Sequence, residues 1–222
     1  MRLYLASTSP ARLALLRSAG IEPVLRDPAV DEDAVALAAA RERGGPLSPS
    51  DVVDILARAK AEAAFGAIDS EGDEDGLILG GDSVFVLDGV IYGKPHTAEK
   101  ARERWQLQRG RTGHLYSGHW LIERTAGVRG RAVGAVAVAD VTFSDDLGDD
   151  ELDAYIATGE PLFVAGAFTI DSLGAPFISR IAGDPSTVVG LSLPTLRRLV
   201  MSLGHPWPSL WTSRVPAAQS NL

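Results

Sequence analysis

The sequence predicts an α/β protein in which a mixed central sheet is flanked by helices. Short apolar stretches of strand length alternate with longer segments that have helical spacing and residues typical of helix starts. Turn signals between apolar stretches also predict hairpins, above all Asp88-Gly89. Alternation favours parallel pairing, whereas a hairpin pairs neighbouring strands antiparallel, so we expect a sheet that contains both.

Length and composition indicate the class of protein. The chain has 222 residues, which suits a single domain over residues 1–204 followed by a proline-containing tail, residues 205–222. It contains no cysteine, which excludes disulfides, thiolate zinc sites and cysteine nucleophiles. The formal net charge of −8 argues against nucleic acid as the main partner, because phosphate neutralisation needs a basic face.

The cellular location is predicted from the absence of a signal peptide and of a membrane-spanning segment in the sequence. After a short apolar stretch the N-terminal residues turn polar at once, unlike those of a signal peptide. The longest apolar runs fall far short of the roughly 20 residues that span a bilayer. We therefore expect a cytoplasmic protein with no membrane partner.

The N-terminal region predicts a strand, a helix and a second strand. Residues 3–6 are a short apolar run, and Ser9 stands where a helix N-cap is expected, with Pro10 at the first helical position. Gly20 is well placed to end this helix. Residues 21–26 are predicted as the second strand.

The next helix is expected to begin near Ser48 and to run to about Phe65. Asp51 stands three residues after Ser48, which is the spacing of a reciprocal cap. Apolar residues every three or four positions give the helix one apolar face. The acidic residues 69–75 are then predicted as a solvated loop.

The central region predicts a strand, a hairpin and a helix. Residues 77–79 are typical of a buried strand, which is expected to end at Gly80-Gly81. The arms of the hairpin are residues 84–87 and 90–92. A polar helix follows from Thr97 to about Gly110.

The C-terminal region is predicted to alternate again. In order, we expect long strands over 113–124 and 132–143 joined by a glycine- and arginine-rich turn, a helix over 149–158, short strands over 165–170 and 177–181, and a last helix opened by Pro194. Three prolines follow from His205 onward, and they predict a poorly ordered tail.

The first candidate site is the helix start at residues 7–10, Ser-Thr-Ser-Pro. Free backbone N–H groups and the positive end of the helix dipole suit a phosphate. Arg12 lies in the first helical turn, where a cation is unfavourable unless an anion is bound. The alternative is an ordinary capped helix with a solvated arginine.

The other candidates are isolated charged residues. Asp82, after two glycines, suits a metal ligand or a general base, or else is a turn residue bonded to its own backbone. Glu32 either helps Asp82 to hold a metal ion or belongs to an acidic helix start. Lys60 and Lys94 are either ligands of an anion or solvated surface lysines.

Other familiar sites are missing from the sequence. It has no P-loop, no Gly-x-Gly-x-x-Gly before a helix and no histidine pair at zinc spacing. Any metal would therefore have oxygen ligands, which favours Mg²⁺ or Mn²⁺.

Together these segments resemble the Maf family of nucleotide pyrophosphatases over residues 3–203. The resemblance is carried by blocks in the family's order: residues 5–12 (Leu-Ala-Ser-Thr-Ser-Pro-Ala-Arg), Asp31-Glu32, Ala59-Lys60-Ala61, Gly81-Asp82-Ser83, Asp88-Gly89 with Gly93-Lys94-Pro95, Gly110-Arg111-Thr112, residues 154–161 and residues 188–191.

The resemblance implies an elongated, two-lobed fold like that of inosine-triphosphate pyrophosphatases, with a central cleft and often in a homodimer. It implies an acid-anhydride hydrolase that converts nucleoside triphosphates, including non-standard or modified ones, to the monophosphate and pyrophosphate with a divalent metal. By position, Asp82 would be the catalytic carboxylate and would bind the metal with Glu32. Phosphate contacts would come from Ser7, Ser9, Arg12, Lys60 and Lys94.

The sequence departs from the family pattern at three positions. Ala11 stands where the family has the first of two arginines, Ser83 where the better-known branches carry Thr or Gln, and Asp171 where they carry Gln or Glu. These positions are linked in the family to the choice of base. Ser83 and Asp171 are therefore included among the substrate-binding residues, but no base preference carries over. A carboxylate at Asp171 could accept hydrogen bonds from a base edge.

A second function stays open at this stage. The family is also associated with the regulation of cell division and septum formation. A regulator of that kind would bind the nucleotide with little turnover. It would need the phosphate site but no positioned base.

Overall fold

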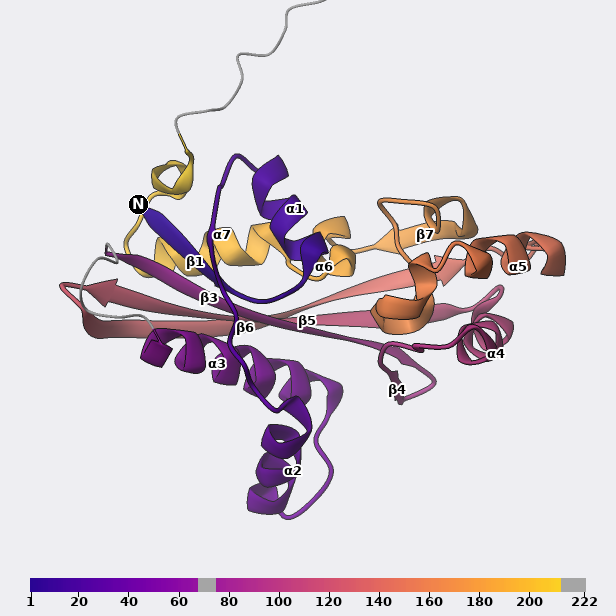
Figure 1. The fold of residues 1–222 in the computed structure, drawn as a ribbon, viewed down its shortest axis with the longest axis horizontal. Helices are drawn as coiled ribbons and strands as arrows, with labels where there is room; N and C mark the ends of the chain where they lie inside the picture. Colours follow the sequence, from indigo (N-terminus) through magenta and orange to yellow (C-terminus); the bar gives the residue numbers. More distant parts are fainter. Residues whose placement is uncertain (68–74, 213–222) are drawn as a thin grey trace, which may run out of the picture.

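The computed structural model describes residues 1–67 and 75–212. In this part of the chain, a mixed sheet of seven strands carries helices on both faces (Figure 1). The strands are β1 (Arg2–Ala6), β2 (Val24–Arg26), β3 (Gly76–Leu87), β4 (Val90–Tyr92), β5 (Thr112–Thr125), β6 (Val128–Phe143) and β7 (Ile178–Ala182). The α-helices are α1 (Pro10–Ser18), α2 (Glu32–Arg43), α3 (Pro49–Ala67), α4 (Ala98–Gln108), α5 (Asp149–Ala157), α6 (Pro185–Val189) and α7 (Leu193–Ser202). The 3-10 turns are η1 (Glu160–Phe163), η2 (Ala165–Ala167), η3 (Ala175–Phe177) and η4 (Trp207–Leu210).

The predicted mixed sheet is confirmed. The strand order is β2-β1-β3-β5-β6-β7, with β4 beside β3. β1 is parallel to β2 and to β3, and the remaining pairs are antiparallel. Figure 1 shows α1, α6 and α7 on one face of the sheet and α3 on the other, with α2 standing away from the sheet. In the described residues, every helix is too short or too polar to cross a lipid bilayer.

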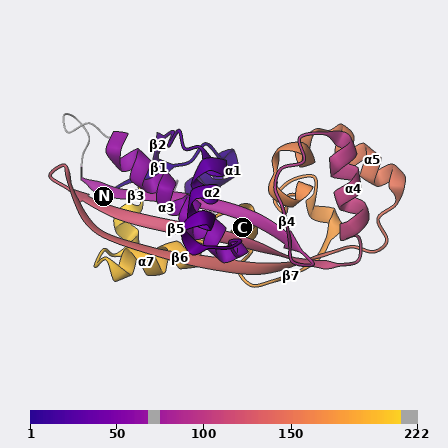
Figure 2. The ribbon, with the colours of Figure 1, turned by 90° about the horizontal axis from the view of Figure 1, so that it is seen from below.

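Helices gather at the two ends of the long strands. Figure 2 shows α4 and α5 with the neighbouring turns at one end, and α1, α3 and α7 at the other. The first end has an aromatic core, in which Phe143 meets Phe85, Trp105 and Phe168 edge-on. The other end is packed mainly with leucines from β1, β3 and α7. The molecule therefore has two groups of helices along one continuous sheet.

Several local predictions are confirmed. Ser9 Oγ accepts the Arg12 N–H at 3.4 Å, as expected of an N-cap. Ser48 and Asp51 cap α3 reciprocally, because each side-chain oxygen accepts the other's backbone N–H at 3.2 Å. β3 and β4 form the hairpin around Asp88-Gly89.

One strand prediction was wrong, and another was too long. Turn η2 stands within the segment 165–170, and Gly166 and Ala167 there have φ of 73° and 63°. Left-handed backbone of this kind cannot continue a strand. The strand predicted over 21–26 is limited to β2, because only three of its residues pair with β1.

The prediction of a poorly ordered tail from His205 was wrong for the residues up to 212. Trp207 and Leu210 are apolar, and they pack turn η4 against the leucine core, where Leu210 is buried. The N-terminal ammonium of Met1 donates to Ser209 O at 2.7 Å, which ties this segment to the start of the chain. Residues 213–222 of the predicted tail and residues 69–74 of the predicted acidic loop lie outside the described residues.

Two glycines let α3 lie against the sheet. Gly80 on β3 and Gly118 on β5 face this helix, and a Cβ on either would overlap its backbone, at Ala57 O and at Val53 O respectively. The helix therefore approaches more closely than larger side chains would allow. This approach brings Lys60, three residues beyond Ala57, down to the strand.

Candidate active site

The candidate site lies at an interruption in the pairing of β3. β1 pairs with β3 as far as Ala6 opposite Gly80, and β4 pairs with it from Phe85 onward. Among the described strands, none covers residues 81–84 on this edge, whereas β5 pairs with them on the other edge. This stretch of β3 therefore lacks a strand neighbour on one edge, although Ser83 is the only one of its four residues that is partly exposed.

Asp82 lies within β3 and not after its end, which corrects the prediction from the sequence. Gly80 and Gly81 do not end the strand. They leave room for the groups that pack against it: Gly80 faces α3, and a Cβ at Gly81 would stand 3.3 Å from Arg12 Nε. Successive side chains of a strand point to opposite faces. Asp82 accordingly meets α3, and Ser83 meets α1 and the end of α6.

Lys60 is a buried lysine held between two carboxylates. Its Nζ lies 2.7 Å from Asp82 Oδ1 and 2.7 Å from Glu32 Oε1. The side chains of Lys60 and Asp82 are each 9% exposed, whereas that of Glu32 is 52% exposed. The reading of Lys60 as a solvated surface lysine is therefore wrong, because an apolar helix face buries its stem while the ammonium is neutralised locally.

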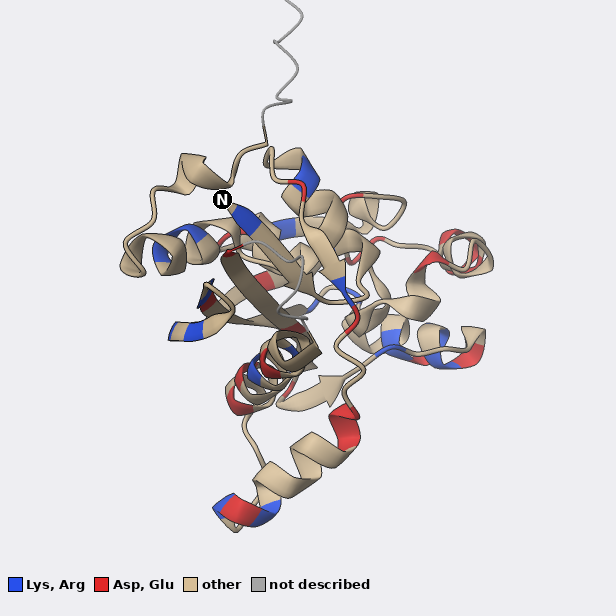
Figure 3. Cartoon of the chain, turned by 60° about the vertical axis from the view of Figure 1, so that its left-hand side comes forward, with Lys and Arg blue, Asp and Glu red and all other residues tan. Residues whose placement is uncertain are grey.

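Glu32 reaches the site from the first residue of α2. Asp31 caps this helix by accepting the Ala34 N–H at 3.0 Å, which confirms that the acidic segment is a helix start. The role of Glu32 in binding a metal ion stays a prediction. Figure 3 shows the acidic start of α2 directed toward the body of the molecule and its arginine-containing end directed away. The helix itself, of which the sequence indicated only an acidic start, buries none of its residues.

Arg12 approaches the same edge from the other face of the sheet. Its guanidinium donates from Nε to Gly190 O at 2.7 Å, from Nη1 to Ser7 Oγ at 3.1 Å and from Nη2 to Ser83 Oγ at 2.9 Å. The residue is 8% exposed. All three acceptors are neutral, and Arg12 forms no ion pair with any described residue.

Burial lowers the pKa of Arg12 below its ordinary value, and the charges of Asp82 and Glu32 only partly offset this. A guanidinium stays protonated in proteins despite such a shift. The site therefore holds a buried cation at a helix N-terminus without a bonded counterion. An anion bound there would relieve the cost of burying that charge.

Ser7 and Ser9 shape the start of α1. Ser7 Oγ accepts from Arg12 Nη1 and from the Ser9 N–H, the latter at 3.2 Å. Ser9 Oγ is used as the helix cap. Each hydroxyl can therefore still donate a hydrogen bond to a bound anion.

Ser83 belongs to a network that the sequence did not reveal. Its Oγ lies 3.0 Å from Ser117 Oγ and 3.2 Å from Gly190 O, and Ser117 Oγ donates to Thr187 O at 2.9 Å. This network ties α6 to the sheet beside Arg12. Asp184 before Pro185 is a helix-start signal that could have predicted α6. Nothing local marked Ser117, because an isolated serine in a strand is common.

Lys94 lies just outside this cluster. It is exposed two residues after β4, and it makes no ion pair with a described residue. β4 runs antiparallel to β3, and its pairing ends with Tyr92 opposite Phe85, two residues before Lys94. The hairpin therefore returns the chain toward the uncovered edge of β3.

Asp171 is not brought together with the other predicted residues. It is exposed in the segment between η2 and η3, and its side chain has no hydrogen bond or ion pair with a described residue. The cluster formed by the fold thus contains Ser7, Arg12, Glu32, Lys60, Asp82 and Ser83, with Ser9 as the cap of α1.

The donor set suits a hard divalent cation. Asp82 and Glu32 each use one oxygen for Lys60, and the second oxygen of each carboxylate has no partner among the described residues. The described residues contain no cluster of three or more His, Asp or Glu side chains at metal-binding distance. Mg²⁺ commonly needs only one or two carboxylates, because water and substrate phosphates complete its shell. The two carboxylates fit that mode of binding.

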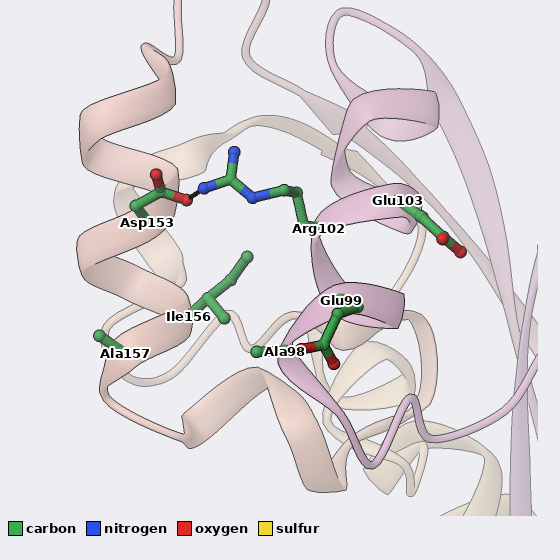
Figure 4. Close-up of a pocket in the computed structure, with 7 residues that line it drawn as sticks. All are labelled: Ala98, Glu99, Arg102, Glu103, Asp153, Ile156 and Ala157. Atoms are coloured by element: carbon green, nitrogen blue, oxygen red, sulfur yellow. Dashed lines mark ion pairs between the residues drawn. The ribbon is translucent and has the colours of Figure 1, made fainter.

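A separate surface hollow of about 490 Å³ lies between α4 and α5. Figure 4 shows Arg102 reaching across it to Asp153, with Ile156 below the ion pair and Glu103 pointing away. None of the predicted site residues lines this hollow. The hollow is therefore separate from the cluster at β3.

Comparisons with known proteins match nearly the whole chain. The model of a family described as "Maf-like protein" matches residues 2–203. A protein of Leifsonia xyli subsp. xyli named "Nucleoside triphosphate pyrophosphatase" is 66% identical over 211 residues, which cover 95% of this chain and 97% of that protein. Proteins of the same name from Salinispora tropica and Rhodococcus opacus are 49% and 48% identical, over 96% and 94% of this chain and 88% and 95% of their own lengths.

Proposed function

The chain belongs to the Maf-like protein family, and from this premise we propose that it hydrolyses nucleoside triphosphates to the monophosphate and pyrophosphate. It is a nucleoside triphosphate pyrophosphatase, a hydrolase, like the relatives that carry this name. One observation carries the details: Lys60 beside Asp82 and the unpaired Arg12 converge from opposite faces on the uncovered edge of β3. Cleavage of a phosphate anhydride depends mainly on such positioning and charge neutralisation.

Asp82 is the proposed catalytic carboxylate. Lys60 holds Asp82 Oδ1 at 2.7 Å, which leaves Oδ2 to orient a water molecule and to accept its proton. The water oxygen then bonds to the α-phosphorus as the bond from this phosphorus to the α–β bridging oxygen breaks, so that the monophosphate forms and pyrophosphate leaves. The ion pair fixes the carboxylate in one orientation, and Lys60 also contributes positive charge toward the phosphates.

Phosphate binding is assigned to Ser7, Ser9, Arg12, Lys60 and Lys94. Arg12 offers a buried cation at the start of α1, where the positive end of the helix dipole also favours an anion. Lys94 is exposed at the end of the hairpin and would complete the cation set when the triphosphate is bound. Ser83 contributes through Arg12, because Ser83 Oγ accepts a hydrogen bond from Arg12 Nη2 at 2.9 Å.

Glu32 and Asp82 would together hold a divalent cation, Mg²⁺ or Mn²⁺. What supports this is the second oxygen of Glu32, which has no partner among the described residues, and Asp82 Oδ2, which has one lone pair for the ion and one for the water that it orients. When bound, such an ion neutralises charge on the phosphates. Lys60 keeps the two carboxylates close together without the ion.

The base of the substrate is assigned to the neighbourhood of Asp171. The proposal includes non-standard or modified nucleotides, because Ser83 and Asp171 both differ from the better-known branches. A carboxylate accepts hydrogen bonds from amino or imino groups, as on cytosine N4. The nucleotide would lie in a cleft between the two groups of helices. A single domain over residues 1–204, a homodimer and a cytoplasmic location also remain part of the proposal.

The test is pyrophosphate release from a panel of ordinary and modified nucleoside triphosphates, with Mg²⁺ or Mn²⁺. Asp82→Asn is expected to lower turnover by about 10²–10⁴-fold, the usual contribution of a positioned base. Asp140→Asn is the control, because Asp140 is a half-exposed acid on β6 that, among the described residues, forms an ion pair with His114 alone. Its turnover should equal that of the wild type.

Near-normal turnover of Asp82→Asn would remove Asp82 from the catalytic role. Nucleotide binding without release of pyrophosphate by the wild-type protein would contradict the enzymatic proposal. It would favour instead the nucleotide-binding regulator. Equilibrium binding of the same panel, measured beside turnover, separates the two functions.

A further inference from the structure

Glu160 has an unusually complete set of hydrogen-bond donors. Its Oε1 accepts from Tyr155 Oη at 3.0 Å, from Thr169 Oγ1 at 2.5 Å and from the Gly174 N–H at 3.1 Å. Its Oε2 accepts from Ser172 Oγ at 2.7 Å and from the Leu173 N–H at 3.2 Å. One carboxylate thus ties together both ends of the segment 169–174.

This segment carries Asp171, and it is fixed on either side of that residue. Thr169 and Ser172 donate to Glu160, whereas the exposed side chain of Asp171 between them has no partner among the described residues. The segment is also tight: a Cβ on Gly174 would stand 2.6 Å from Tyr155 Oη. The backbone of the segment is therefore held in one conformation, and the Asp171 carboxylate is exposed to solvent.

The preceding turn is anchored separately. Trp105 Nε1 donates to Ala167 O and Gln108 Nε2 donates to Gly166 O, both at 2.7 Å. Both donors lie on α4, within or beside the aromatic core. The start of the segment is therefore fixed by the core, and its remaining course depends on Glu160.

Glu160 holds the segment 169–174 in its ionised form. Burial raises its pKa, but the hydrogen bonds from Thr169, Ser172 and Leu173 outweigh burial and hold the pKa below its ordinary value. Hydrogen bonds to an ionised acceptor are roughly twice as strong as neutral ones. Glu160 takes no part in the apolar core, so its loss should affect the segment more than the core.

We propose that Glu160 is a positioning residue for the choice of base, which fixes the segment 169–174 so that Asp171 presents its carboxylate to the edge of the nucleobase. This inference rests on the proposed function, in which Asp171 contacts the base. Glu160 itself touches no substrate. It acts through the conformation of its neighbours.

The test compares Glu160→Gln, Asp171→Asn and the double variant. For each, kcat and KM are measured for pyrophosphate release from triphosphates that differ only in the base. Both single variants are expected to lower the ratio of kcat/KM between the best and the next substrate by about tenfold, the discrimination of one good polar contact to a base. The change should lie in KM. The double variant should lose no more than either single one, because both act on the same contact.

Glu151→Gln is the matched control. Glu151 is an exposed glutamate of the same helix group, and it caps α5 by accepting the Gly148 N–H at 3.1 Å. Its loss removes a structural hydrogen bond but should leave the ratio between bases unchanged. A wild-type ratio in Glu160→Gln, or losses that add in the double variant, would overturn the inference.

Two further measurements keep the result decisive. If Glu160→Gln does not fold, Ser172→Ala takes its place, because it removes one exposed donor to Glu160, and an unchanged ratio would then overturn the inference. Calorimetric binding of nucleoside monophosphates that differ in the base gives the same ratio without turnover. Absence of hydrolysis by the wild type would thus contradict the proposed function alone.

Discussion

Lys60 on α3 and Asp82 on β3 form a buried ion pair, with 2.7 Å between Lys60 Nζ and Asp82 Oδ1. The helix can come this close because Gly80, two residues before Asp82, has no side chain between the strand and the helix backbone. The same ammonium lies 2.7 Å from Glu32 Oε1. The ion pair thus joins the fold of the chain to the chemistry of the site.

Replacing Lys60 by Met is expected to destabilise the protein by about 3–5 kcal/mol, the cost of leaving a buried charge without its partner. Denaturant unfolding measures this change. The double variant Lys60→Met, Asp82→Asn should recover part of the loss, because the unpaired charge is then removed as well. Lys100→Met, at an exposed position of α4, is the control and should change stability little. Equal effects at the two lysines would contradict the importance of the ion pair.

Gly80→Ala tests the approach of α3. The added Cβ would overlap Ala57 O, so the helix must shift, and overpacking of this kind costs about 1–3 kcal/mol. We also expect turnover to fall, because the shift moves Lys60 away from Asp82. Gly66→Ala on the same helix has no neighbour within 4 Å and should be neutral or slightly stabilising. Unfolding free energies and turnover of both variants decide the matter, and full activity of Gly80→Ala would count against the close approach.

Arg12→Lys is expected to raise KM for the triphosphate by about 10-fold or more, because lysine cannot reproduce the guanidinium fork that meets Ser7, Ser83 and Gly190. Arg17→Lys is the control on the same helix, since Arg17 is exposed and pairs with Glu22. Steady-state pyrophosphate release gives KM for both variants. The assignment of Arg12 fails if the two substitutions have the same effect.

Removal of divalent metal by EDTA is expected to abolish pyrophosphate release, and added Mg²⁺ or Mn²⁺ to restore it. Glu32→Gln should raise the metal concentration needed for half-maximal activity, because it removes one of two carboxylate ligands. Asp33→Asn, one residue further along α2 and also exposed, should leave that concentration unchanged. Activity that persists in EDTA would contradict the metal assignment.

His119 makes the stability depend on pH. Burial lowers its pKa to about 4, although the hydrogen bond to Ala135 O acts in the opposite direction and raises the pKa. Its Nε2 accepts the Ser192 N–H at 2.8 Å. Because the folded-state pKa lies below the ordinary 6.5, the unfolded chain binds the proton first. This contribution is fully present above about pH 6.5 and is lost as the pH falls toward about 4.

Between pH 7.5 and 5.0 the loss from His119 should be about 2 kcal/mol. Denaturant unfolding at the two pH values measures the total change for the wild type and for His119→Gln. The variant should show a correspondingly smaller change, whatever its stability at pH 7.5. An identical change in both proteins would exclude His119 as its source.

Short-range signals predicted many elements of the fold correctly. The caps at Ser9 and at Ser48 with Asp51, and the hairpin at Asp88-Gly89, depend on residues within four positions of one another. The strand predicted over 165–170 was wrong because its apolar residues serve a left-handed turn, in which Ala167 has φ of 63°. That conformation is held by α4 through hydrogen bonds to Gly166 and Ala167, which no local pattern announces.

By itself, the sequence determined the mixed α/β class, the helix starts, the hairpin and, through its ordered blocks, the family. Only the tertiary structure decided how the site is assembled. Arg12 meets Gly190, 178 positions away, and Lys60 meets Asp82, 22 positions away. Those contacts depend on where β1 stops and β4 begins along β3, and on how closely α3 approaches it. Strand register and helix approach are set by packing between distant segments, so they follow from the whole fold and from no single stretch of sequence.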